Sequence, residues 1–124
     1  MNRKNLIIFP IFLGFLFTAL SQETKLFYHE DKAYQDALAL YNSQQYQAAQ
    51  TIFEKVKVET KDYETEANSA YYAANAAIRL SQRGADKKME SFVESYPTST
   101  KRNSAFLDVA DYYFETGKYP YALK

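Results

Sequence analysis

Apolar residues recur at spacings of three and four over much of the chain, which is the period of an amphipathic helix. The first run lies at residues 34–41 and the second at 46–56, and Asn42 to Gln45 between them are turn-tolerant residues. Residues 56–59 alternate between apolar and polar, but this run is too short to outweigh the stripe before it. We therefore predict two helices joined by a turn, with residues 56–59 as a fraying helix end.

A longer helix is predicted at residues 63–81, with Asp62 as its N-cap and Glu64 and Glu66 in its first turn. Small apolar residues lie on nearly all faces of this segment. Such a helix is expected to pack between neighbouring helices at close range. Gly84 suits the turn after it.

Two more helices are predicted in the carboxy-terminal half. Asp86 opens a helix that runs to about Tyr96, and Pro97 stops it. Residues 98–100 offer hydroxyl caps for the next helix, which Gly117 ends, and residues 119–124 begin another. The apolar face of the first of these helices comprises Ala85, Met89, Phe92 and Val93. That of the second comprises Phe106, Val109, Ala110, Tyr113 and Phe114.

Corresponding small residues recur with a period of 36 or 37 residues. In the first helix of each pair they are Ala37, Ala73 and Ala110, and in the second helix they are Ala49, Ala85 and Ala122. A helix pair repeated at this period is the signature of an α-solenoid, because one pair alone cannot bury both of its apolar faces. We therefore predict an all-α fold of antiparallel helix pairs, about two and a half repeats long, with these alanines where helices approach most closely.

The first 21 residues resemble a secretory signal peptide. Arg3 and Lys4 precede an apolar stretch, and Ala19 and Ser21 supply the small residues of a cleavage site. The alternative is an uncleaved anchor, but residues 6–20 are shorter than the stretch of about 20 apolar residues that spans a bilayer. We expect cleavage after Ser21, a lead-in segment at 22–29 and a repeat domain at 30–124.

Composition and charge exclude several classes of function. The 15 basic and 15 acidic residues balance, so the chain lacks the basic footprint of a nucleic-acid binder. Without Cys there is no disulfide, thiolate metal site or lipid-modified amino terminus, and one His excludes a site with two imidazoles. No nucleophile–base pair, phosphate loop or pair of catalytic carboxylates is apparent. We expect no enzyme activity, no metal and no cofactor.

The third repeat resembles the tetratricopeptide repeat family. The resemblance is carried by Phe106, Val109, Ala110, Tyr113, Gly117, Tyr119 and Ala122, with Pro97 where that family closes a repeat. The junction at residues 96–99 is similar to that of a periplasmic branch associated with the Tol–Pal system and with outer-membrane assembly in Gram-negative bacteria. The resemblance is weaker in the first repeat, which has Lys61 and Asp62 where the closing proline would be.

The resemblance implies a scaffold that holds ligands in a groove lined by the first helix of each pair. From the side of each first helix that would face this groove, we predict that ten residues line it: Tyr34, Leu38, Tyr41, Asn42, Ala70, Ala74, Ala77, Asp111, Phe114 and Glu115. In the pairs Tyr71-Tyr72 and Tyr112-Tyr113, the second Tyr matches a core position and the first is a candidate for the groove or surface.

We therefore expect an exported, non-catalytic adaptor for protein or peptide partners. It would work in the periplasm or at the outer membrane, and would touch a membrane only through its signal segment or its partners. The alternative is the amino-terminal sensing or docking domain of a larger envelope signalling protein or machine. The second helix of the third repeat stops at Lys124, two residues past Ala122, so we also expect the repeat domain to be truncated at its carboxy-terminal end.

Overall fold

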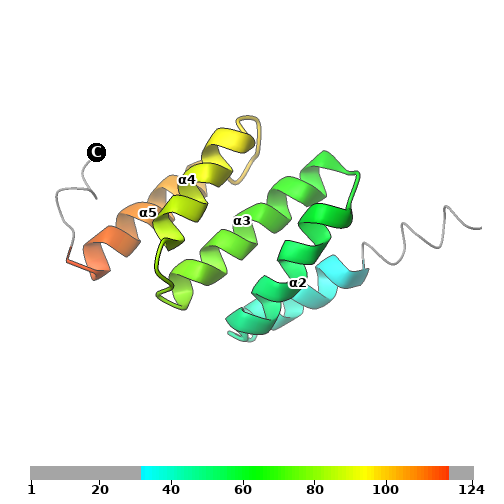
Figure 1. Ribbon diagram of the computed structural model, residues 1–124, viewed down its shortest axis with the longest axis horizontal. Helices are drawn as coiled ribbons and strands as arrows, with labels where there is room; N and C mark the ends of the chain where they lie inside the picture. The colour runs from blue at the N-terminus through cyan, green and yellow to red at the C-terminus, as the bar shows by residue number, and fades with distance from the viewer. Residues whose placement is uncertain (1–31, 118–124) are drawn as a thin grey trace, which may run out of the picture. The chain divides into compact units, whose positions relative to one another are not determined.

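The computed structural model describes residues 32–117, and all of its regular structure in this range is helical. A helix over residues 32–42 is followed by α2 (Tyr46–Glu59), α3 (Tyr63–Arg79), α4 (Ala85–Ser95) and α5 (Arg102–Glu115). The predicted all-α stack of antiparallel helix pairs is confirmed, and Figure 1 shows the helices side by side in chain order. The predicted signal segment, the lead-in and residues 118–124 lie outside the described residues.

Helix α3 is the centre of the stack. It packs against α2, α4 and α5, as its small side chains predict. Ala73 joins a core cluster with Ala37, Ala49 and Phe53, whereas Ala70 and Ala74 join a second cluster with Met89 and Phe92. Of the predicted close-packing alanines, Ala37, Ala49, Ala73 and Ala85 are fully buried, Ala110 is half-buried, and Ala122 is not described.

Aromatic rings link the two clusters. Tyr72 stacks on Phe53 with 5.2 Å between centroids and meets Tyr41 and Tyr71 edge-on at 5.1 and 5.2 Å. Tyr71 in turn contacts Phe92 at 5.6 Å. Each such pair adds about 0.5–1.5 kcal/mol beyond the area it buries, so the rings tie successive repeats together.

The first helix of each pair ends in the same way. Gln44, Ser81 and Gly117 adopt left-handed backbone conformations, at positions 37 and 36 residues apart. The next amide donates back to a carbonyl five residues earlier, from Gln45 to Leu40 and from Gln82 to Ala77, each at 2.9 Å. These are Schellman motifs, in which glycine is the usual left-handed residue.

Several predicted boundaries hold and others need correction. Asp62 caps α3 by accepting a 2.8 Å hydrogen bond from the Thr65 amide. Helix α2 is regular through Glu59 and does not fray. Helix α3 ends at Arg79, not at the predicted residue 81, and Ser81 is the left-handed residue after it. Gly84 is the N-cap of α4. The N-cap of α5 is Lys101, which forms no side-chain cap bond. Instead, the Ser99 hydroxyl accepts a hydrogen bond from the Lys101 amide, just before the helix begins.

The apolar face predicted for α5 is only partly buried. Tyr113 is buried, but Phe106 and Phe114 are 55% and 65% exposed. Among the described helices α5 packs only against α3 and α4, so part of its circumference has no neighbour to cover it. Tyr71 and Tyr112, the predicted candidates for the groove or surface, are both buried, and so is Tyr113. Tyr72, predicted at a core position, is only half-buried.

Candidate functional site

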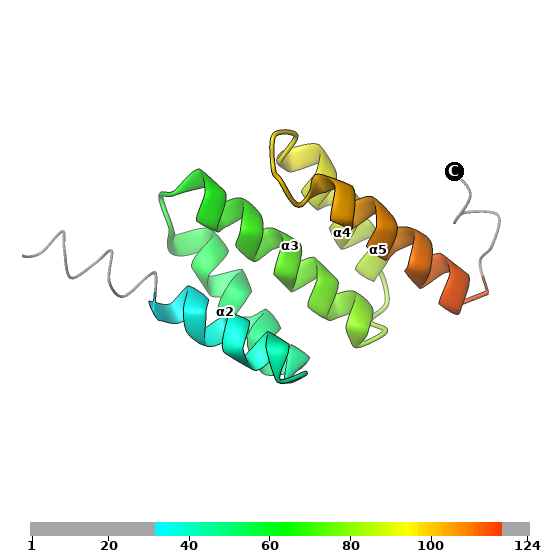
Figure 2. The ribbon, with the colours of Figure 1, turned by 180° about the vertical axis from the view of Figure 1, so that it is seen from behind.

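The first helices of the three pairs share one side of the molecule. In Figure 2 the helix over residues 32–42, α3 and α5 lie in front, while α2 and α4 lie behind them. We call the surface formed by these three helices the first-helix face. The buried side chain of Asn75 links one repeat to the next on this face.

A hydrogen-bonded network crosses this face from one repeat to the next. The Tyr41 hydroxyl donates to the side-chain carbonyl of Asn75. The Asn75 amide nitrogen donates to Asp108 at 2.6 Å, and the Tyr71 hydroxyl donates to the same carboxylate oxygen at 2.8 Å. Residues 41, 75 and 108 are 34 and 33 positions apart and lie on three successive first helices, so the network joins neighbouring repeats.

Because Asn75 is buried, its hydrogen bonds contribute to the stability of the fold. Asn75 is only 2% exposed and is flanked by alanines, so its amide has no water to replace a lost partner. A buried polar group without a partner costs about 1–3 kcal/mol. Arg79 is exposed, and its Nε lies 3.4 Å from the Asn75 carbonyl oxygen. Of the charged groups beside the network, Asp108 is held in place by two hydrogen bonds before any ligand arrives.

Two tyrosines of this network keep their protons to high pH. Burial raises the pKa of Tyr41 above its ordinary value. Burial also raises the pKa of Tyr71, and the hydrogen bond to Asp108 raises it further, because ionisation would place two negative charges together. Both hydroxyls are therefore neutral donors at physiological pH, and neither is poised to act as a base.

A cavity of about 220 Å³ lies between α3 and α5 beside the network. Its lining includes three carboxylates, Asp108, Asp111 and Glu115, and one basic side chain, Arg79. Ile78 and Tyr112 supply its apolar walls. The cavity therefore combines an excess of negative charge with apolar surface that fits the stem of a long side chain.

The opposite end of α5 carries positive charge. The Lys101 ammonium lies over the rings of Tyr72 and Tyr71, with distances of 5.3 and 5.7 Å to the centroids. A cation within about 6 Å of a ring face is attracted by the ring's negative face. The first-helix face thus has a lysine at the start of α5 and carboxylates towards its end.

Seven of the ten residues predicted to line the groove fall into three groups. Asp111 and Glu115 line the 220 Å³ cavity together with the network. Tyr34, Leu38 and Tyr41 are half-buried around the first core cluster, with Tyr34 5.8 Å from the Phe53 ring. Asn42 and Phe114 are exposed and do not line that cavity.

The three predicted alanines lie away from the first-helix face. Ala70 and Ala74 face α4 and line a different hollow, and Ala77 is fully buried. The sequence-based prediction assigned the small-residue stripe of α3 to the groove. The first-helix face is instead built from the polar stripe that contains Asn75 and Arg79.

The sequence-based site missed Asn75, Arg79, Asp108 and Lys101. Asn75 carried a usable signal, because it is the one polar residue within the run from Ala73 to Ala77. Its spacing from Tyr41 and Asp108, 34 and 33 residues, differs from the repeat period, so these partners could not be read from the repeat. Lys101 gave no such signal, because its contact with two rings depends on how the chain turns after Pro97.

Within residues 32–117 no group of three or more His, Cys, Asp or Glu side chains is placed to hold a metal ion. None of the helices in the same range has the length and apolar character needed to cross a bilayer. Comparisons with protein-family models, with curated proteins and with solved structures found no match to this chain.

Proposed function

We propose that this protein is a non-catalytic scaffold that binds an extended peptide segment of a protein partner on its first-helix face. The observation that carries the proposal is the network through Tyr41, Asn75 and Asp108. It positions the Asn75 amide and the Asp108 carboxylate beside an open cavity. A surface organised in advance binds with a smaller loss of conformational entropy, which favours recognition of a defined segment.

The size and charge of the cavity indicate what it would take. At about 220 Å³ it is smaller than the roughly 300–1,000 Å³ of typical small-molecule sites, so one side chain fits better than a whole ligand. Asp111 and Glu115 have no ion-pair partner among the described residues, and with Asp108 they outnumber Arg79. The segment we propose therefore inserts a lysine or arginine.

The proposal places the protein in the envelope of a Gram-negative bacterium, as a tetratricopeptide-like adaptor of the periplasm or outer membrane. Support comes from the signal-like residues 1–21 and from the repeat pattern, in which Pro97 closes a repeat and Gly117 ends a helix. Export is tested by mass spectrometry of the protein from its native host. A mature amino terminus at Gln22 is expected, and an intact Met1 would contradict export with cleavage.

Binding is tested by charge reversal on the full-length protein. Asp111→Lys places a cation in the cavity, whereas Glu94→Lys makes the same change at an exposed position on α4 outside it. Each immobilised variant is exposed to envelope extract, and the retained proteins are quantified by mass spectrometry. A partner that Glu94→Lys retains and Asp111→Lys loses supports the proposal. Equal retention by both variants would contradict it.

A further inference from the structure

A second and larger hollow opens on a different side of α3, between α2 and α4. Its volume is about 490 Å³, within the range of ligand-binding cavities. Figure 1 looks onto the two helices that flank it. Ala70 and Ala74 form its floor, and Phe92 and Tyr96 of α4 contribute aromatic wall. The first-helix face uses none of these side chains, so the hollow is a separate feature.

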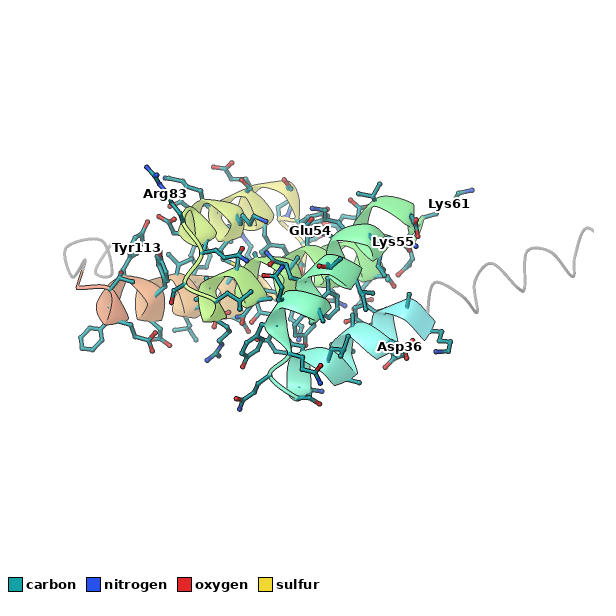
Figure 3. All side chains as sticks on the ribbon, turned by 60° about the horizontal axis from the view of Figure 1, so that its bottom comes forward. Asp36, Glu54, Lys55, Lys61, Arg83 and Tyr113 are labelled. Atoms are coloured by element: carbon teal, nitrogen blue, oxygen red, sulfur yellow. The ribbon has the colours of Figure 1, made fainter. Side chains whose placement is uncertain are left out.

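The hollow exists because two second helices are held apart. Helices α2 and α4 both pack on α3 but make no backbone contact with each other. Alanines at positions 70 and 74 leave space that larger side chains would fill. The gap is bridged by an ion pair between Lys88 and Glu54 at 3.3 Å, and Figure 3 labels Glu54 on α2. The floor is therefore apolar and recessed, and charged side chains stand around it.

The charges around the hollow are mainly positive. Lys57, Lys87 and Lys88 line it, against the single carboxylate of Glu54. Lys57 and Lys88 both bind Glu54, at 2.5 and 3.3 Å, and Lys87 binds Glu90 at 2.8 Å. An ammonium group has three donors, so each lysine can bind another carboxylate.

We propose that this hollow is a second docking site, which takes an acidic peptide segment of a protein partner. One large apolar side chain of the segment rests on Ala70, Ala74 and Phe92, and its neighbouring carboxylates bind the lysines. The first-helix face favours a basic segment and this hollow an acidic one. The protein would therefore bind two different segments at once, on two sides of α3.

The probe is a fluorescently labelled pentapeptide with one phenylalanine between two pairs of aspartates, titrated with the full-length protein. Two control peptides replace the phenylalanine by serine or the aspartates by lysines. Both features are required by the proposal, so we expect each control to bind at least about tenfold more weakly. Equal binding of all three peptides, or no binding of the acidic one, would overturn the proposal.

Matched variants locate the binding. Lys87→Glu and Lys55→Glu each reverse an exposed lysine that pairs with a glutamate on its own helix, but only Lys87 lines the hollow. Likewise Ser91→Trp fills the hollow from its rim, while Ser104→Trp adds the same ring at an exposed site on α5. We expect about tenfold weaker binding for Lys87→Glu and Ser91→Trp, and at most about twofold for the controls. Equal losses in variant and control would overturn the proposal.

The proposed binding on the first-helix face can be tested independently of the proposed site in the hollow. Asp111→Lys alters the first-helix face and is expected to leave the affinity for the acidic peptide within about twofold. If it abolishes binding of that peptide, the peptide binds elsewhere and the proposed second site is wrong.

Discussion

The Asn75 side chain donates a 2.6 Å hydrogen bond to the carboxylate of Asp108, which lies 33 residues further along the chain. Asn75 is on α3 and Asp108 on α5, so this bond joins the first helices of two successive repeats. Tyr41 approaches Asn75 from the repeat before. One buried amide therefore connects three repeats on the face that we propose binds a partner.

Replacing the Asn75 amide should destabilise the fold, because its partners lose a hydrogen bond. Asn75→Leu leaves the Tyr41 hydroxyl and the Asp108 carboxylate without this partner, and we expect it to lower the free energy of unfolding by about 1–3 kcal/mol. Asn68→Leu, at a half-buried position on the same helix, should stay within about 0.5 kcal/mol. Urea unfolding measures both. Equal losses would mean that the network contributes no stability.

The left-handed helix ends predict a gain in stability. Gln44 and Ser81 occupy positions where glycine pays no steric penalty, so Gln44→Gly and Ser81→Gly should each stabilise the fold by about 0.5–1 kcal/mol. Lys55→Gly, at an exposed position inside α2, should instead destabilise it by about 1 kcal/mol. Thermal unfolding distinguishes the signs. A loss of stability at residue 44 or 81 would contradict the assigned conformation.

Close packing of the alanines predicts a graded response. Ala73→Leu forces three extra carbons into a buried contact between helices and should cost about 1–3 kcal/mol. Ala110→Leu should cost less, because Ala110 is half-buried, and Lys87→Leu should stay within about 0.5 kcal/mol on its exposed face. Urea midpoints of the three variants give the order. A larger effect at residue 87 than at 73 would refute the packing described here.

Alkaline pH should weaken the stack. Burial raises the pKa of Tyr34 and of Tyr96 to about 12, and the hydrogen bond of Tyr96 to Glu66 adds to the effect. The unfolded chain loses these protons near pH 10, whereas the folded chain keeps them, so stability falls as pH rises from about 10 to 12. Urea unfolding between pH 8 and 12 tests this. In Tyr96→Phe the fall should be shallower, and an unchanged slope would contradict the assignment.

Much of the fold was predictable because helix periodicity is a local property. The spacing of Ala37, Ala73 and Ala110 indicated the repeat, and Asp62 indicated the start of α3. The ends of the first helices were harder. Gln44 and Ser81 hold a conformation that their residue types do not favour, and only Gly117 matched the expected residue.

The site was less predictable, because it depends on which side of each helix meets its neighbour. On α3 the stripes containing Ala74 and Asn75 differ by one residue in sequence, yet one lines the hollow and the other the first-helix face. Periodicity alone cannot make that distinction in a helix with small residues on most faces. The partners of Asn75 lie in other repeats, so the network appears only once the helices are stacked.

Site-specific photocrosslinking in the native host tests the central claim most directly. A benzoylphenylalanine is placed at Asp111 or Glu115, which line the first-helix cavity, or at the exposed Val58 on α2, which does not. If the first-helix face binds a partner, both cavity positions should give the same crosslinked protein in the cell envelope, and residue 58 should give none. The same adduct from all three positions, or an adduct only from residue 58, would contradict the account.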